Sequence, residues 1–236
     1  MKKTKYSIII PARNEQNSIA NAINKVASAL KGTAYEIIVA EDGSTDDTVK
    51  QAAKACKKLP NASLLHSEKR LGRGKAVCQA FAKAKGEVVA FIDADLSPGL
   101  DSLKPVLLQA ERHGIAIGSR YLMQSRVERG AARSIASKAY NLLAKLLLGT
   151  KVSDHQCGLK AFRKSIALQL CQQCTQKGWS WDTEILAIAH ENGFDIAEVP
   201  VNWKERKKGA SKVKVARDAI RMFFELLRIA ARPHAR

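Results

Sequence analysis

Two aspartates separated by one residue follow the most apolar strand-like run of this chain, and their spacing suits metal binding. The run covers residues 87–92, and Asp93-Ala-Asp95 comes directly after it. In an extended segment alternate side chains point to the same side, so these carboxylates would lie about 6–7 Å apart along the chain. Hard carboxylate oxygens beside a diphosphate are typical ligands of Mg²⁺ or Mn²⁺. The alternative is a solvated acidic turn, but the position at a strand end favours the metal.

Polar segments also follow two other apolar runs, at residues 6–10 and 36–40. The first is followed by Pro11-Ala-Arg-Asn-Glu15 and the second by Glu41-Asp-Gly-Ser-Thr-Asp46. Carboxylates at such positions can accept hydrogen bonds from a ribose or a base edge. The alternative for both segments is an ordinary helix entrance with a polar cap. Because ligands bind at the carboxyl ends of parallel strands, these segments and Asp93-Ala-Asp95 together predict a binding site.

A glycine-rich turn, Leu71-Gly-Arg-Gly-Lys75, opens a helical pattern. It matches neither the P-loop nor the full dinucleotide-binding turn, which disfavours an ATPase or a dehydrogenase. A helix N-terminus beside Arg73 and Lys75 can still attract phosphate. The second half of the chain supplies many further cations, most of which we expect on the solvated surface. A minority near Asp93 would form a phosphate clamp.

The elements that must position these residues alternate between strand and helix over the first 120 residues. We expect strands at 6–10, 36–40, 63–66, 87–92 and 116–119, and helices at 17–30, 48–59 and 75–85. This alternation predicts an α/β fold with a mainly parallel sheet flanked by helices. Further on, we expect helices at 134–148, 182–192 and 215–231, and basic loops at 126–133 and 204–214. The chain shows no repeat or linker, so residues 1–236 are predicted to form a single domain.

The charge of the chain points to an anionic partner. Lys and Arg number 40 against 22 acidic residues, a formal net charge of +18, and residues 204–236 hold eleven of these cations against three acids. Nucleic acid, an anionic membrane surface and a phosphorylated substrate are the three candidates. A nucleic-acid-binding protein without catalysis gives no reason for Asp93-Ala-Asp95 at a strand end, so we expect no nucleic-acid partner.

Five widely spread cysteines argue against a secreted disulfide framework. The lone Cys171-Gln-Gln-Cys174 lacks the second pair that a zinc site needs, so we expect buried thiols. The apolar run near the N-terminus is too short for a signal peptide, and no stretch approaches the ~18 apolar residues of a membrane-spanning helix. These features predict a cytoplasmic protein that is peripherally associated with a membrane.

The ordered series of motifs resembles the polyprenyl-phosphate hexose synthases, which are the dolichyl-phosphate mannosyl- and glucosyltransferases of glycosyltransferase family 2. It comprises the three strand-end segments above together with Gly72-Arg-Gly-Lys-Ala76 and Gly118-Ser-Arg-Tyr121. The second half resembles the glucosyltransferase branch, through Asp154-His-Gln-Cys-Gly-Leu-Lys160, Trp179-Ser-Trp-Asp-Thr-Glu184, Glu198-Val-Pro-Val-Asn-Trp203 and Gly209-Ala-Ser-Lys212. The resemblance covers about residues 6–230 and implies the GT-A fold of nucleotide-diphospho-sugar transferases.

The resemblance also implies roles for individual residues. Asp93 and Asp95 would hold Mg²⁺ or Mn²⁺, and Asp95, Arg120 and Arg133 would form the catalytic set, with Arg120 reaching the donor diphosphate. Binding of the nucleotide sugar would fall to Pro11, Arg13, Glu15, Asp42, Asp93 and Arg206. The acceptor phosphate would be bound by Arg133, Ser137 and Lys212. The family often has two aspartates where this chain has Glu41-Asp42, which is a departure at the expected base contact.

The implied reaction is inverting transfer of a hexose from a nucleotide sugar to a polyprenyl or dolichyl phosphate. We expect UDP-glucose as the donor and GDP-mannose as the alternative, and a non-catalytic nucleotide-sugar binding module is a further alternative. An acceptor phosphate is ionised at neutral pH and needs little help from a general base. The segment 215–231 has an apolar side with Phe223, Phe224 and Leu227 surrounded by arginines. It is predicted either to pack on the sheet or to lie in a membrane interface.

Overall fold

The computed structural model of the protein describes residues 3–205 and 215–232. Its centre is a seven-stranded sheet with the order β3-β2-β1-β4-β7-β5-β8. The strands are β1 (Tyr6–Ala12), β2 (Tyr35–Glu41), β3 (Ala62–Leu65), β4 (Val88–Ile92), β5 (Ile115–Ser119), β7 (Leu159–Arg163) and β8 (Ile196–Pro200). Only β7 runs antiparallel to its neighbours within this sheet, so the predicted mainly parallel sheet is confirmed.

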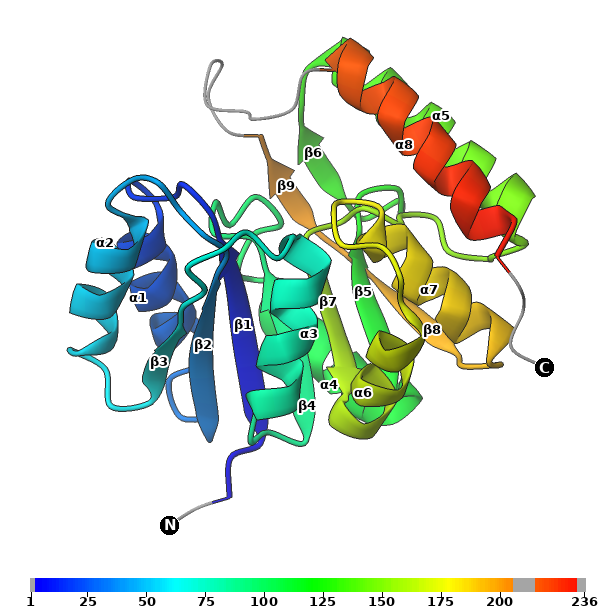
Figure 1. Ribbon diagram of the computed structural model, residues 1–236. Helices are drawn as coiled ribbons and strands as arrows, with labels where there is room; N and C mark the ends of the chain where they lie inside the picture. Colours follow the sequence, from blue (N-terminus) through cyan, green and yellow to red (C-terminus); the bar gives the residue numbers. More distant parts are fainter. Residues whose placement is uncertain (1–2, 206–214, 233–236) are drawn as a thin grey trace.

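Helices cover both faces of the sheet (Figure 1). One face packs against α1 (Ile19–Ala29), α2 (Thr48–Cys56) and α4 (Leu103–His113). The other face packs against α3 (Arg73–Lys83), α6 (Lys164–Gln173) and α7 (Trp181–Glu191). This layering follows from the period of two in an extended chain, which sends alternate side chains of a buried strand to opposite faces.

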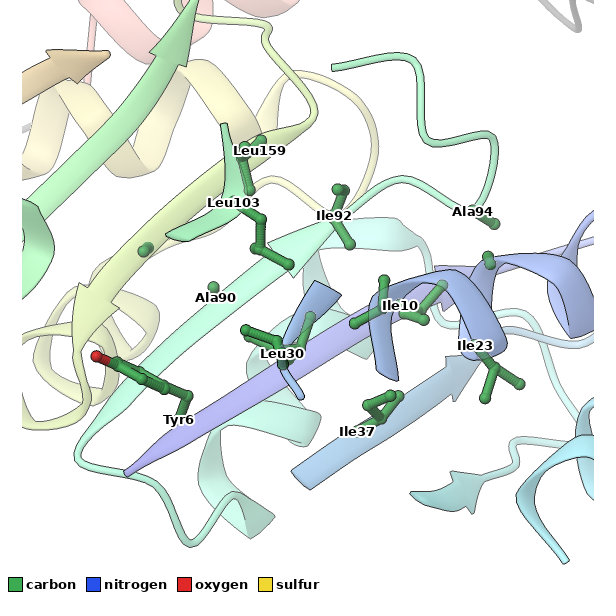
Figure 2. Packing of buried hydrophobic residues seen from close by; sticks show 14 of the residues in the cluster. Tyr6, Ile10, Ile23, Leu30, Ile37, Ala90, Ile92, Ala94, Leu103 and Leu159 are labelled. Atoms are coloured by element: carbon green, nitrogen blue, oxygen red, sulfur yellow. The ribbon is translucent and has the colours of Figure 1, made fainter. Parts of the chain in front are cut away.

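Strand β1 shows how one sequence run serves both layers. Ile8 and Ile10 are fully buried against the helices of one face, whereas Ile9 is fully buried on the other. Figure 2 shows buried side chains on the face covered by α1, α2 and α4, among them Ile10 of β1, Ile23 of α1 and Ile37 of β2. The continuous apolar runs of the sequence are therefore those of strands buried on both faces.

A smaller substructure lies beside the main sheet. Strands β6 (Arg126–Glu128) and β9 (Asn202–Lys204) form a two-stranded parallel sheet. Helices α5 (Ala131–Leu148) and α8 (Val215–Ala230) pack side by side, on the opposite side of the molecule from α1 and α2 (Figure 1). None of the helices within residues 3–205 and 215–232 is both long and apolar enough to cross a bilayer.

Most predicted elements are confirmed to within a few residues, but two expectations are wrong. Residues 126–133 form β6 and the start of α5 instead of a loop, because β6 is held by pairing with β9, a strand some 75 residues away. Not all cysteines are thiols either, since Cys78 of α3 and Cys171 of α6 form a disulfide. Their Cα atoms are 5.8 Å apart because these two helices pack together, which brings the sulfurs into bonding range. The predicted loop at 204–214 lies outside the described residues from position 206 onward.

Candidate active site

The loops that follow β1 and β2 are tied to each other by hydrogen bonds. The backbone N–H of Asn14 donates to Ser44 Oγ at 3.0 Å, and the Thr45 N–H donates to Asn14 Oδ1 at 2.9 Å. The Glu15 N–H donates to Thr48 Oγ1 at 2.6 Å, at the start of α2. Because β1 and β2 are parallel neighbours, their carboxyl ends meet at one sheet edge, as the sequence predicts.

Two acidic residues at the end of β2, Glu41 within the strand and Asp42 directly after it, hold this edge together. Glu41 is buried and accepts hydrogen bonds from the Ser44 N–H at 2.6 Å and from His66 Nδ1 at 2.5 Å. Burial opposes the charge of Glu41, but these hydrogen bonds outweigh burial and lower its pKa. Asp42 Oδ1 accepts the N–H groups of Leu71 at 2.5 Å and of Gly72 at 3.1 Å. Asp42 therefore fastens the glycine-rich turn beneath the strand end.

The other predicted nucleotide-binding residues line the end of β1. Pro11 lies in the strand, paired with Ala40, and is half-buried. Arg13 and Glu15 follow within the loop and are also half-buried. Glu15 Oε2 accepts a hydrogen bond from the Ser18 hydroxyl at 2.5 Å. Arg206 lies outside the described residues.

Asp93 and Asp95 follow β4, the strand next to β1. The Asp93 N–H donates to the Gly158 carbonyl at 3.0 Å, which continues the pairing of β4 with β7 by one residue. Asp95 is exposed, and its Oδ1 accepts the Ser97 N–H at 3.0 Å. Gly158 packs directly beneath Asp93, because a Cβ atom added at that glycine would lie 1.9 Å from Asp93 Oδ2. The backbone on both sides of the pair therefore fixes where the Asp93 carboxylate sits.

Asp93 is part of a chain of alternating charges. Arg73 Nη2, at the first position of α3, donates to Asp93 Oδ1 at 2.6 Å, and Arg73 Nη1 pairs with Asp182 Oδ2 of α7. Asp182 Oδ1 in turn accepts Lys160 Nζ of β7 at 2.8 Å, and Lys160 also donates to the Cys157 carbonyl at 2.7 Å. Burial raises the pKa of Asp93, the charges of Asp95 and Asp182 act in the same direction, and Arg73 opposes them.

Close packing between α3 and α7 creates this arrangement. The Gly74 N–H donates to the Lys177 carbonyl at 2.9 Å. A Cβ atom at Gly74 would lie 2.3 Å from Cγ of Trp181, so only glycine permits this approach. The Arg73 guanidinium lies 4.9 Å from the ring centre of Phe91 and 5.2 Å from that of Trp179, both within cation–π range. The glycine-rich turn therefore places Arg73 beside Asp93 at the end of β4.

The donor set fits a divalent cation that takes much of its coordination shell from substrate. Within residues 3–205 and 215–232 no group of three or more His, Cys, Asp or Glu side chains could hold an ion by itself. Asp93 and Asp95 would supply two carboxylate ligands. Mg²⁺ commonly binds through one or two carboxylates, keeps several waters and completes its shell with phosphate oxygens. The chemistry of the pair therefore suits Mg²⁺ or Mn²⁺ bound together with a diphosphate.

Arg120 is buried and already engaged in an ion pair. Its Nε and Nη2 atoms donate to the two oxygens of Asp154, each at 2.7 Å, and its guanidinium lies 4.7 Å from the ring centre of Trp203. Although burial alone would raise it, the pKa of Asp154 is lowered by this contact. In this structure Arg120 joins the end of β5 to the 152–158 segment.

Two of the three predicted acceptor residues, Arg133 and Ser137, lie on α5. Ser137 is buried and accepts a hydrogen bond from the Tyr121 hydroxyl at 2.7 Å. Arg133 Nη1 donates to Glu205 Oε1 at 2.5 Å, and Glu205 also accepts the Gly130 N–H at 3.1 Å. Arg133 is thus held at the start of α5 by a carboxylate that follows β9. Lys212 lies outside the described residues.

Sequence reasoning gave no role to three residues that shape this site, which are Asp154, Gly158 and Asp182. All three fall within the segments that carry the resemblance to glucosyltransferases, and this is the signal that could have marked them. Their partners, Arg120, Asp93 and Arg73, are distant in sequence, so spacing alone does not reveal the contacts.

The fold is that of the GT-A glycosyltransferases. Glucosyl-3-phosphoglycerate synthase from Mycobacterium tuberculosis, solved in complex with uridine diphosphate, superposes with a TM-score of 0.71. The two chains are 23% identical, and the match covers 98% of this chain and 81% of that one. Another structure of the same enzyme, with Mn²⁺, UDP-glucose and phosphoglyceric acid, gives a TM-score of 0.69 at 23% identity and the same coverage.

The chain belongs to glycosyl transferase family 2, whose family model matches residues 7–170. Glycosyltransferase AglD of Haloferax volcanii is 36% identical, and the match covers 94% of this chain but 36% of that protein. Dolichyl-phosphate beta-glucosyltransferase ALG5A of Trichomonas vaginalis is 30% identical, over 95% of this chain and 72% of its own length. The dolichyl-phosphate beta-glucosyltransferase of Saccharomyces cerevisiae is 28% identical, over 94% and 72%. The resemblance found in the sequence is thereby confirmed.

Proposed function

We propose that this protein transfers glucose from UDP-glucose to a polyprenyl or dolichyl phosphate, with inversion at the anomeric carbon. The observation that carries the proposal is the Asp93–Asp95 pair at the end of β4, in a family 2 chain whose relatives include dolichyl-phosphate beta-glucosyltransferases. UDP is the nucleotide bound in the glucosyl-3-phosphoglycerate synthase structure of the same fold, which favours a uridine donor.

The site residues would divide the work between donor and metal. Asp93 and Asp95 would hold Mg²⁺ or Mn²⁺, which supplies positive charge to the departing diphosphate. Glu15 and the β1 and β2 loops would contact the nucleoside, and Asp42 would act there through the glycine-rich turn that it fastens. Arg73 would add a second cation next to the diphosphate, because it lies at a helix N-terminus beside Asp93.

The acceptor phosphate needs a cationic binding site more than it needs a general base. A phosphate oxygen that is ionised at neutral pH can attack the anomeric carbon from the side opposite the leaving diphosphate. The protein then contributes positioning and charge compensation. Arg133 and Ser137 on α5 would bind the acceptor, and Arg120 would remain a predicted contact of the donor diphosphate that Asp154 orients.

A lipid acceptor requires a surface that meets a membrane, and α5 with α8 offers one. On α5, Ile135, Leu142 and Leu146 are 69%, 60% and 72% exposed, and on α8 Phe224 is 57% exposed. We call the exposed apolar side chains of these two helices the α5–α8 platform; they are Ile135, Leu142, Leu143, Leu146, Leu147, Phe223, Phe224 and Leu227. The exposed cations Lys138, Arg221 and Arg228 lie on the same two helices.

This combination fits the interface of an anionic bilayer. Apolar side chains enter the boundary between headgroups and acyl chains, and each basic residue near the surface contributes about 1 kcal/mol. The platform also begins next to Arg133 and Ser137 on α5, so a phosphate headgroup bound there would have its lipid chain near the membrane. Peripheral binding through the platform would bring the site to its acceptor.

The donor is tested by calorimetry with Mn²⁺ present. UDP-glucose should bind more tightly than GDP-mannose, and Asp93→Asn should weaken binding of the uridine donor while the protein stays folded. A clear preference for GDP-mannose would reverse the donor and leave the reaction class, as in the alternative of a polyprenyl-phosphate mannosyltransferase. Tight binding without turnover on any acceptor would favour the non-catalytic module.

The membrane contact is tested by sedimentation with vesicles that contain anionic lipid, at low and high salt. The full chain should bind at low salt, and changing Arg217, Arg221 and Arg228 together to Gln should abolish binding. A matched control removes the same charge from the opposite side of the molecule, by changing Lys25, Lys50 and Lys54 of α1 and α2 to Gln. If the full chain stays in the supernatant, or if the two triple variants behave alike, the membrane proposal is wrong.

A further inference from the structure

The negative charge of Asp93 already has a cationic partner, Arg73, when no metal ion is bound. Arg73 donates to Asp93 Oδ1 at 2.6 Å, and its other terminal nitrogen pairs with Asp182. The Arg73 side chain is 12% exposed, so little water screens these contacts. The two terminal nitrogens of the planar guanidinium each pair with one carboxylate, and these two contacts together hold the positive charge in one position.

Asp182 is fully engaged in the same cluster. One of its oxygens accepts Arg73 and the other accepts Lys160 at 2.8 Å, and the Lys160 side chain has no exposed surface. A carboxylate bound on both oxygens by cations is poorly suited to accept a proton from a substrate. Its geometry suits it instead to anchor the arginine, while Lys160 anchors Asp182 to β7 through the Cys157 carbonyl.

We propose that Arg73 is a built-in competitor for the divalent cation and that Asp182 is the positioning residue that holds Arg73 in that place. The guanidinium occupies an oxygen of Asp93 that a metal ion would need, so the Asp93–Asp95 pair binds a metal weakly by itself. A nucleoside diphosphate supplies anionic oxygens to both the arginine and the ion. Metal binding therefore becomes strong only with the donor.

This inference rests on the proposed function, because it concerns the same metal and donor site. It adds a coupling between the two ligands, and such a coupling is reciprocal: UDP strengthens Mn²⁺ binding by the factor by which Mn²⁺ strengthens UDP binding. An arginine with a purely structural role would give no such effect, and its loss would leave Mn²⁺ affinity unchanged or lower it.

The test measures Mn²⁺ binding by electron paramagnetic resonance of the free ion, with and without UDP. In the absence of UDP, Arg73→Gln should bind Mn²⁺ about tenfold more tightly than the wild type, a size typical of coupled sites. The factor by which UDP improves Mn²⁺ binding should fall correspondingly. Arg73→Lys keeps the charge without the bridging fork and should lie between the two.

Asp182→Asn, alone and combined with Arg73→Gln, tests the positioning role of Asp182. If Asp182 holds Arg73 against Asp93, then Arg73→Gln should tighten Mn²⁺ binding less in the Asp182→Asn background than in the wild type, because the guanidinium is no longer fixed in the competing place. The control is Arg70→Gln, which removes the same charge from an exposed side chain in the preceding loop. Circular dichroism and thermal unfolding establish that each variant is folded at the temperature of measurement.

The outcomes separate the two proposals. If Arg73→Gln matches the wild type or the Arg70→Gln control while Mn²⁺ and UDP still bind together, the competitor role is wrong and the proposed function stands. If Mn²⁺ binds neither wild type nor variants even with UDP, the metal site itself is wrong and both proposals fall. Tighter Mn²⁺ binding by Arg73→Gln, with a smaller gain from that change in the Asp182→Asn background, supports the inference, and an equal gain in both backgrounds contradicts the positioning role of Asp182.

Discussion

Replacing Gly158 by alanine should disable the site while leaving the fold in place. The added Cβ would lie 1.9 Å from Asp93 Oδ2, whereas real Cβ contacts essentially never fall below 3.0 Å. The carboxylate must therefore move by at least about 1.1 Å. A displacement of about 1 Å in a catalytic group can cost about 100-fold in rate, which corresponds to ~2.7 kcal/mol of transition-state stabilisation.

The measurement is steady-state transfer together with Mn²⁺–UDP binding for Gly158→Ala. The clash falls on the end of a side chain that can rotate, so activity and metal binding should suffer more than the free energy of unfolding. Gly178→Ala is the matched control, because the nearest atom to its added Cβ is Arg221 Nη2 at 3.9 Å. If Gly158→Ala keeps the turnover and Mn²⁺ affinity of the wild type, the position of the Asp93 carboxylate does not depend on this glycine.

A double variant decides whether Gly158 acts through Asp93. In an Asp93→Ala background the carboxylate is gone, so the contacts of the new Cβ with Oδ2 and Cγ of Asp93 are removed. Any destabilisation that Gly158→Ala causes in the wild type should then largely disappear, giving a clear interaction energy. If the two changes add independently, the glycine is required for another reason.

Two further predictions concern buried groups around the site. Asp154→Asn leaves the buried Arg120 guanidinium without its carboxylate, so the free energy of unfolding, measured in urea, should fall by about 3–5 kcal/mol, and a loss below about 1 kcal/mol would contradict the buried ion pair. His155 is fully buried, and burial lowers its pKa from 6.5 to about 4. In the unfolded chain His155 takes up a proton at a higher pH than in the folded protein. The free energy of unfolding should therefore fall by about 3 kcal/mol as the pH falls from 7 to 4, and it should fall clearly less for His155→Gln. Equal pH dependence of wild type and variant would contradict this assignment.

The strand framework was predictable because buried parallel strands leave a strong local signal. Residues 6–10, 36–40 and 87–92 are short apolar runs ended by polar residues, and each forms a strand of the central sheet. Adjacency of their carboxyl ends then follows from parallel pairing. This is why Asp93, Glu15 and Asp42 could be assigned to one edge before any contact was known.

The elements that the sequence missed depend on distant partners. Strand β6 has three exposed residues and exists because β9 pairs with it. The disulfide joins Cys78 and Cys171 across 93 residues, and nothing in their spacing marks them as partners. Local periodicity cannot reveal either feature, because both are consequences of how the helices and strands assemble.

Residue roles were harder to predict than residue positions. The sequence places Arg120 at the donor diphosphate, which stays a prediction, but it gives no sign that the Nε and Nη2 atoms of Arg120 both donate to Asp154. Asp182 had no predicted role, although it joins Arg73 and Lys160. A motif indicates which residues gather at a site, but the charge partner of each residue depends on the tertiary structure.

Sugar transfer itself provides the sharpest test of the proposed function. UDP-glucose labelled in the sugar is incubated with the protein, Mn²⁺ and a polyprenyl phosphate in anionic vesicles, and label in the lipid extract is counted. We predict a labelled glycolipid that needs the acceptor phosphate and disappears with EDTA or with Asp95→Asn. Failure of every nucleotide sugar to label the lipid, or labelling that continues unchanged in EDTA and with Asp95→Asn, would contradict metal-dependent transfer to a lipid phosphate.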